Sequence, residues 1–220
     1  PDPYIFVLLL TLITLVFAVV IQDQSPLTTV QQWGDGFWGL LTFSMQMLLV
    51  LVTGFMLACT PLVKTLLENL ARLAKSPGSA IVLVTLVSLT ASWINWGFGL
   101  VVGALFAKAL ARKVSVDYRL LVASAYSGFI VWHGGLAGSV PLTIATPGHF
   151  SEAQIGVIGT SETIFSGFNL LLLAIMFVVI PLVNRLMLPP KSESVIVDST
   201  KLQDDVLPSS ANERPADRLE

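Results

Sequence analysis

The stretch Ser92-Trp93-Ile94-Asn95-Trp96-Gly97 interrupts an otherwise apolar, charge-free window that runs from residue 76 to residue 107. It divides the window into two arms of roughly 15 residues, and at 1.5 Å per residue each arm reaches about 22 Å. That length is short of the roughly 30 Å of hydrocarbon in a bilayer. Basic residues bound both ends of the window, which places both ends on the same side: Lys75, Lys108, Arg112 and Lys113.

Two short arms with matching basic ends predict a re-entrant helical hairpin over residues 76–111. Its turn would stop inside the membrane, where irregular backbone must be buried in protein or line a water-filled cavity. The alternative is a pair of tilted full spans joined by a tight external turn.

The composition favours a membrane protein over a soluble one. Of the 220 residues, 54% are hydrophobic and 12% are charged, against about 25% charged in soluble domains. Nothing in the charge distribution indicates a nucleic-acid-binding surface. The single cysteine, Cys59, excludes an intramolecular disulfide and is interpreted as a packing residue. The start at Pro1 without an initiator Met suggests a fragment.

Four further charge-free windows cover residues 3–22, 36–63, 120–151 and 163–184. The loop between the first two contains Asp23 and Asp35 but no Lys or Arg, whereas Lys64, Arg72 and Lys75 follow the second window. The positive-inside rule therefore predicts that the chain starts in the cytoplasm and that this loop is outside. Trp33 and Trp38 would belong to an interfacial aromatic belt.

Thr60-Pro61 predicts a helix start, with the threonine as N-cap and the proline in the first turn. Five leucines then fall on one helical face: Leu62, Leu66, Leu67, Leu70 and Leu73. This helix would lie on the membrane surface or extend the second span into the cytoplasm, and the two interpretations are equally compatible with the sequence. Residues 1–75 would form a scaffold-like part of two spans and this helix.

The fourth window cannot form a regular helix throughout. The stretch from Trp132 to Pro141 contains three glycines and a proline, which weaken or break the hydrogen-bond ladder. We predict a broken transmembrane helix over residues 120–148 and a last span over residues 163–188. With the hairpin, these form a transport-like part over residues 76–188, and the polar residues 189–220 form a flexible cytoplasmic tail or linker.

A hairpin and a broken helix in one membrane domain are typical of secondary transporters, which bind substrate and ion at half-helix ends near the bilayer midplane. Helix N-termini offer unpaired N–H groups and partial positive charge. No Arg or Lys lies deep in any window, which favours an anion held by dipoles and hydroxyls over one held by a salt bridge.

The candidate substrate- or ion-binding residues lie at the hairpin turn and along the break. Each has an ordinary structural alternative: threonine hydroxyls often bond a carbonyl of their own helix, and an intramembrane histidine either carries a proton or packs as a neutral side chain. Asn95 is the stronger candidate, because a buried amide in lipid needs several partners. The set is Ser92, Asn95, Gly97, His133, Gly134, Gly135, Ser139, Pro141, Thr143 and Thr146.

No cofactor or fixed metal is expected. The sequence is compatible with a coupling Na+ near Ser92 and Asn95 and equally with a coupling H+. Gly99 and Gly103 would let the second arm pack closely on a neighbouring helix. The motifs of zinc proteases, phosphate-binding loops and serine hydrolases do not occur, so the sequence predicts no enzyme.

Three stretches resemble signatures of the bacterial short-chain fatty acid transporters: Trp33 to Trp38, Ile94 to Ala104 and Gly138 to Gly148. The resemblance covers about residues 1–190, and because members are about twice as long, it concerns their N-terminal half. Membership implies an all-helical fold of two inverted repeats, half of the substrate and cation site in this chain, and a missing C-terminal repeat that supplies the other half.

The resemblance further implies a homodimer embedded in lipid in the bacterial inner membrane, with short-chain fatty acids such as acetate or butyrate as small carboxylate substrates and coupling to H+ or Na+. A related dicarboxylate or tricarboxylate carrier and a non-transporting subunit of a membrane complex are the alternatives. Four crossings plus a hairpin depart from the odd number of crossings that an inverted repeat requires, so one span would lie outside the repeat.

Overall fold

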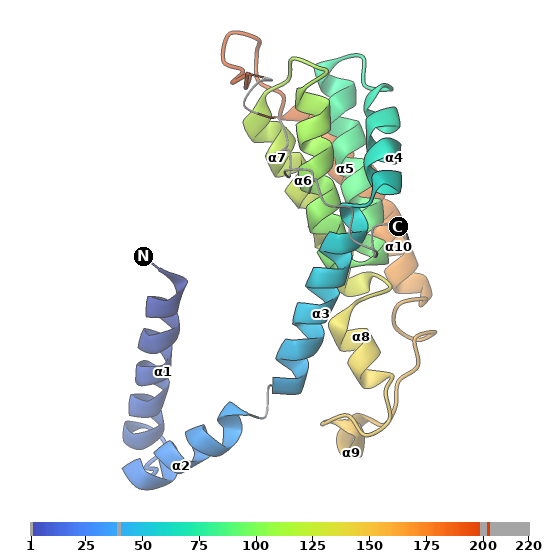
Figure 1. Cartoon of the computed structure of the whole chain (residues 1–220). Coiled ribbons are helices and arrows are strands. Elements are labelled where there is room, and N and C mark those ends of the chain that lie inside the picture. Colours follow the sequence, from blue (N-terminus) through green and yellow to red (C-terminus); the bar gives the residue numbers. More distant parts are fainter. Residues whose placement is uncertain (1, 39–40, 199–201, 203–220) are drawn as a thin grey trace, which may run out of the picture. The chain divides into compact units, whose positions relative to one another are not determined.

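The computed structural model describes residues 2–38, 41–198 and 202, and the described part is helical without strands. It divides into two compact units, Pro1–Val50 and Leu51–Glu220 (Figure 1). The all-helical fold class predicted from the sequence is confirmed.

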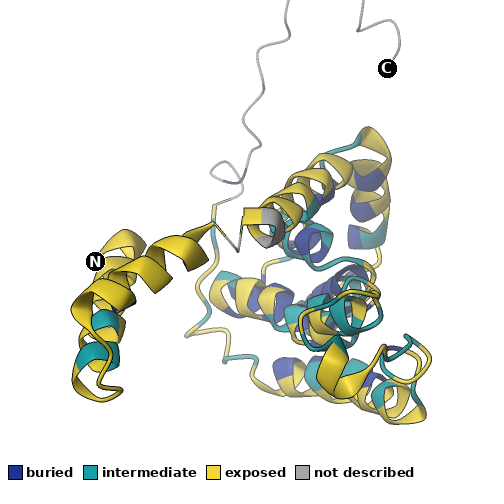
Figure 2. Cartoon of the chain, turned by 90° about the horizontal axis from the view of Figure 1, so that it is seen from below, coloured by how far each residue is buried: buried dark blue, intermediate teal, exposed yellow. Residues whose placement is uncertain are grey.

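The first unit holds α1 (Pro3–Val20), α2 (Pro26–Phe37) and the larger part of α3 (Leu41–Ala58). The Asp2 carboxylate caps α1 by accepting the Tyr4 N–H at 2.8 Å. Most α1 side chains are exposed (Figure 2), as expected of a helix whose natural solvent is lipid.

Helix α2 corrects the prediction of a loop between Asp23 and Asp35. Ser25 caps this helix by accepting the Thr28 N–H at 3.1 Å, and Pro26 occupies the first turn. The Ser-Pro pair is the same start signal as Thr60-Pro61, but α2 lacks the continuous apolar pattern that made the other windows visible.

In the second unit, α4 (Pro61–Ala71) begins as predicted, with Thr60 accepting the Val63 N–H at 3.4 Å. It is bent by 63° from the preceding helical segment Ser44–Ala58. Val63, Leu67 and Ala71 form the buried face that packs on α6, while Leu62 of the predicted leucine face is 79% exposed. The surface-helix and extension interpretations both stay predictions.

The hairpin consists of α5 (Pro77–Ile94) and α6 (Trp96–Ala111), which pack along their lengths. With 18 and 16 residues the arms are longer than predicted, about 27 and 24 Å at 1.5 Å per residue. By length and hydropathy α5 qualifies as a span by itself, and α6 is a shorter apolar helix. The hairpin fold is confirmed, while its re-entrant placement in the bilayer stays a prediction.

Small residues set the distance between the two arms. A Cβ at Gly99 would lie 2.5 Å from both Cα and N of Ser92, and a Cβ at Gly103 would lie 3.1 Å from Ser88 Oγ. The small-residue pair of α6 therefore packs against the serine pair of α5, so the neighbouring helix is the other arm of the same hairpin.

The predicted broken helix is observed as α7 (Tyr118–Ser127), the 3-10 helix η1 (Gly128–Gly134) and α8 (Ser139–Ile144). The change to 3-10 geometry starts at Gly128, earlier than the glycine cluster suggested. There α5 comes so close that a Cβ on Gly128 would lie 2.5 Å from Ser88 Oγ. Ser88 Oγ donates to the carbonyl of Ala125 in the last turns of α7.

The chain then forms the short α9 (Glu152–Ile155) and the last apolar helix, α10 (Gly167–Leu186), which packs on α5, α7 and η1. The Asn184 amide joins three helices, because its Nδ2 donates to Thr85 Oγ1 at 3.0 Å and to Ser127 Oγ at 2.8 Å.

The predicted tail starts as an attached segment. The Tyr118 N–H donates to the Val195 carbonyl at 2.9 Å, and the Val195 N–H donates to Asp117 Oδ2 at 2.8 Å. Apart from Leu202, residues 199–220 of that tail lie outside the described residues.

Within the described ranges, four segments are long and apolar enough to cross a membrane: α1, α5, the broken segment Tyr118–Ile144, and α10. The bent pair of α3 and α4 would be a fifth. This agrees with an integral membrane protein.

Candidate functional site

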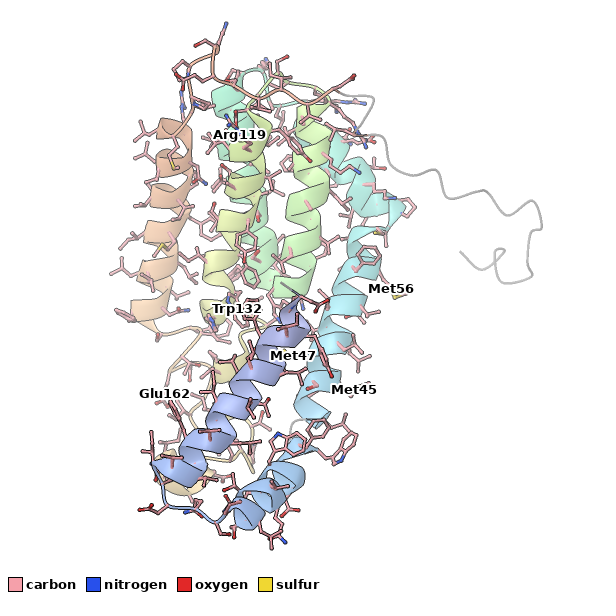
Figure 3. The ribbon with its side chains drawn as sticks, turned by 90° about the vertical axis from the view of Figure 1, so that its left-hand side faces the viewer. Met45, Met47, Met56, Arg119, Trp132 and Glu162 are labelled. Atoms are coloured by element: carbon pink, nitrogen blue, oxygen red, sulfur yellow. The ribbon has the colours of Figure 1, made fainter. Side chains whose placement is uncertain are left out.

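The hairpin turn and the break of the fourth window lie together in the second unit. The Leu136 N–H donates to the Trp93 carbonyl at 2.7 Å. A Cβ at Gly135 would lie 2.5 Å from that carbonyl oxygen, so glycine is needed for the contact. Figure 3 shows Trp132 near the turn end of the bundle and Arg119 at the opposite end of the same broken helix. The structure thus brings together two elements that the sequence predicted separately.

Asn95 makes the turn between the arms with a single extended residue, at φ −154° and ψ 126°. Its backbone N–H ends α5 on the Ala91 carbonyl at 2.9 Å. Its side-chain Oδ1 begins α6 by accepting the Phe98 N–H at 3.0 Å, and its carbonyl accepts the Gly99 N–H at 2.8 Å. Asn95 therefore caps both helices, α5 through its backbone N–H and α6 through its side-chain Oδ1, and its Nδ2 has no partner among the described residues.

The first turn of α6 presents hydrogen-bond donors. The N–H groups of Phe98 and Gly99 donate to Asn95, whereas the backbone N–H groups of Trp96 and Gly97 have no acceptor among the described residues. The indole Nε1 of Trp96 is buried and also lacks an acceptor there. Because a helix N-terminus carries partial positive charge, this turn can accept an anion without a cationic side chain.

Ser92 lies in the interface between the arms. It is 1% exposed, and its Oγ has no partner among the described residues. Both Asn95 oxygens already accept hydrogen bonds. Each oxygen has a second lone pair, so a sodium ion at this point would use Ser92 Oγ and the Asn95 oxygens together with groups supplied from elsewhere. The described residues also contain no group of three His, Cys, Asp or Glu side chains that could hold a metal ion.

On the break, Asn169 near the start of α10 fixes the backbone around Gly134. Its Nδ2 donates to the Gly134 carbonyl at 3.0 Å and to the Ile164 carbonyl at 2.7 Å. His133 is exposed, and its ring centroid lies 3.7 Å from that of Trp132. The predicted residues His133, Gly134 and Gly135 are thus held beside the hairpin turn.

The remaining candidates belong to α8 and the turn that follows it. The Thr143 hydroxyl donates to the Ser139 carbonyl at 2.7 Å, and the Thr146 hydroxyl donates to the Leu142 carbonyl at 2.8 Å. Both hydroxyls thus make the local hydrogen bond of the structural alternative, and a role of these threonines in binding stays a prediction. No hydrogen bond between described residues links Ser139, Pro141, Thr143 or Thr146 to the hairpin turn.

Sequence reasoning missed Asn169 and Asn184 as organising residues. Both lie within the charge-free fifth window. The argument applied to Asn95, that an amide in a lipid-buried helix needs partners, would have identified them. It also missed Trp96, which directly follows Asn95 in the turn.

At the opposite end of the unit, Asp117 caps α7 by accepting the Leu120 N–H at 2.9 Å. The Arg119 guanidinium, 2.9 Å from Asp117 Oδ2, lowers the pKa of this carboxyl from 3.8 to about 2. Burial opposes this shift, and the amides of Val195 and Leu120 reinforce it. This ion pair therefore lies at the opposite end of the unit from the hairpin turn (Figure 3).

The fold and this arrangement define an all-helical integral membrane protein with a helical hairpin packed on a broken helix. The family model "Short chain fatty acid transporter" matches residues 1–219, and the chain belongs to this family.

Two relatives carry the name "Putative short-chain fatty acid transporter". The one from Escherichia coli K12 is 47% identical over 226 residues, covering all of this chain and 51% of the relative. The one from Haemophilus influenzae Rd is 44% identical over 206 residues, covering 90% of this chain and 46% of the relative. The chain therefore spans about half the length of these proteins. No solved structure matches it significantly.

Proposed function

We propose that this chain forms one half of a secondary active transporter that carries short-chain fatty acids such as acetate or butyrate across the bacterial inner membrane. The substrate carboxylate binds at the first turn of α6, facing the break at His133 to Gly135. Transport is coupled to H+ or Na+ by symport, and the protein catalyses no chemical reaction.

The observation that carries this proposal is the donor-rich turn at the junction of hairpin and break. Among the described residues, the backbone amides of Trp96 and Gly97 have no partner. The stretches around the turn and the break, residues 76–107 and 120–151, contain no Lys or Arg. Amide donors at a helix N-terminus stabilise a single carboxylate. A di- or tricarboxylate would need additional positive groups, so the arrangement favours a monocarboxylate.

The family relatives are about twice as long, and we propose that a second, inverted repeat supplies the other half of the site. In that arrangement the hairpin is re-entrant, the tail is the cytoplasmic linker between the repeats, and the complete protein is a homodimer.

The test is uptake of labelled butyrate by liposomes that contain the full-length protein, under an imposed pH or sodium gradient. Butyrate accumulation beyond that of protein-free liposomes under the same gradient, unaffected by excess unlabelled citrate, is the expected result. Uptake that citrate inhibits would favour the dicarboxylate or tricarboxylate carrier. No accumulation of any short-chain carboxylate under either gradient would favour the non-transporting subunit.

A further inference from the structure

Four aromatic side chains gather beside the first turn of α6. The ring centroids of Trp96 and Trp132 lie 5.9 Å apart, those of Trp96 and Phe129 lie 6.5 Å apart, and Phe129 stacks on Trp132 at 5.4 Å with planes 10° apart. Tyr126 stacks on the other side of Phe129 at 6.0 Å. We call Trp96, Tyr126, Phe129 and Trp132 the aromatic cluster.

The aromatic cluster is more than hydrophobic filling. Trp96, Phe129 and Trp132 are half-buried and Tyr126 is 66% exposed, so the rings form part of a surface beside the turn. The buried Nε1 of Trp96 has no acceptor among the described residues. A buried indole N–H normally has a partner, because leaving it unpaired is costly.

The second tryptophan of the turn has different surroundings. Trp93 also has a buried, unpartnered Nε1, but its ring packs with Leu89, Val131 and Leu173 on the side of α10. Of these two tryptophans, Trp96 is the one that belongs to the aromatic cluster and to the first turn of α6, and its Nε1 has no partner in the described part of the chain.

We infer that the aromatic cluster is the specificity surface of the carboxylate site, with Trp96 Nε1 donating to the carboxylate and the rings of Phe129 and Trp132 contacting the alkyl chain. This inference rests on the proposed function and names the residues that select the substrate. An apolar aromatic wall beside one set of N–H donors suits a molecule with one charged end and a short aliphatic end. It disfavours a second carboxylate, which would lose hydration against the rings without gaining a partner.

The test uses the full-length protein in liposomes and three substitutions. Trp96→Phe keeps a ring and removes the N–H, and should raise the KM for butyrate about 10- to 100-fold, the range for loss of one hydrogen bond to a charged group, with the maximal rate unchanged. Trp132→Leu shortens the wall and should shift uptake from butyrate toward hexanoate. Trp33→Phe, in α2, is the matched control and should leave both properties as in the parent.

The outcomes are distinguishable. If the parent takes up butyrate while Trp96→Phe keeps its KM and Trp132→Leu keeps the chain-length preference, the inference is wrong and the proposed function stands. If Trp96→Phe has a lower melting temperature and an unchanged KM, the acceptor of Trp96 Nε1 is a group of the protein and not the substrate. That result also overturns the inference. If Trp96→Phe does not assemble, the chain-length profile of Trp132→Leu decides. A parent that neither transports nor binds butyrate removes both proposals.

Discussion

The close packing of the hairpin arms predicts a graded response to glycine substitution. Gly99→Ala would place a methyl group 2.5 Å from Ser92 Cα and N, and because these are backbone atoms they cannot move aside as a side chain end can. Overpacking of this kind costs about 1–3 kcal/mol, occasionally more, while replacing glycine in a helix gains up to about 1 kcal/mol of propensity.

For Gly99→Ala we expect a net loss of about 2 kcal/mol, which for a unit of this size corresponds to a melting temperature lower by about 4–8 °C. At Gly103 the nearest atoms are Ser88 Oγ at 3.1 Å and the Ala125 carbonyl oxygen at 3.3 Å, so the added methyl group needs a smaller displacement and Gly103→Ala should cost less. Gly34→Ala is the matched control, because it is helical and nothing lies within 4 Å of the added Cβ.

The assay measures thermal unfolding of the purified full-length protein in one detergent. Samples are heated to a series of temperatures, and size-exclusion chromatography measures the folded protein that remains in each. The expected order of melting temperatures is Gly34→Ala at or above the parent, then Gly103→Ala, then Gly99→Ala. A Gly99→Ala protein as stable as the parent would refute the close crossing of α5 and α6.

Three further predictions concern Asn95, Asn184 and Asp117. Asn95→Ala should lower stability by about 1 kcal/mol through loss of the α6 cap, while Asn95→Ser should restore most of it, which a melting curve of each variant checks. Asn184→Leu removes two interhelical hydrogen bonds and should cost about 1 kcal/mol at the roughly 0.6 kcal/mol measured for such bonds in membranes, with Asn169→Leu as a comparison at the other end of α10. The folded pKa of Asp117 lies at about 2, below the ordinary 3.8. Its stabilising contribution is therefore present above pH 3.8 and is lost as the pH falls toward 2. Asp117→Asn should make stability less dependent on pH in this acid range, and an unchanged pH dependence would count against the Arg119 contact.

The helical layout could be predicted from the sequence where a single physical rule decides it. Charge-free windows located α1, the hairpin and α10, and the glycine cluster located the break, because lipid excludes charges and irregular backbone in the same places where the sequence changes. Helix α2 was not predicted, because Gly34, Asp35 and Gly36 are typical of a loop. In this segment the Ser25-Pro26 pair is the signal that indicates a helix start.

The location of the candidate site could be predicted from the sequence, but the roles of its individual side chains could not. Sequence spacing indicated that the turn at Asn95 and the glycines at 134–135 matter, but it could not show that both Asn95 oxygens serve as helix caps. Nor could it show that Thr143 bonds its own helix, or that Asn169 holds the break from another helix. Such assignments depend on which neighbour a side chain meets, and that is decided by tertiary packing.

The single-residue turn at Asn95 has a mechanical consequence. Asn95 ends α5 with its backbone N–H and begins α6 with its side-chain Oδ1, so no further residue separates the two helices, and the Leu136 N–H joins the neighbouring Trp93 carbonyl to the break. A connection of this kind cannot swing open as a flap on flexible hinges, because every backbone dihedral near it is committed to a helix or a cap. Any opening of a passage beside the turn would therefore require whole helices to slide or tilt as one block.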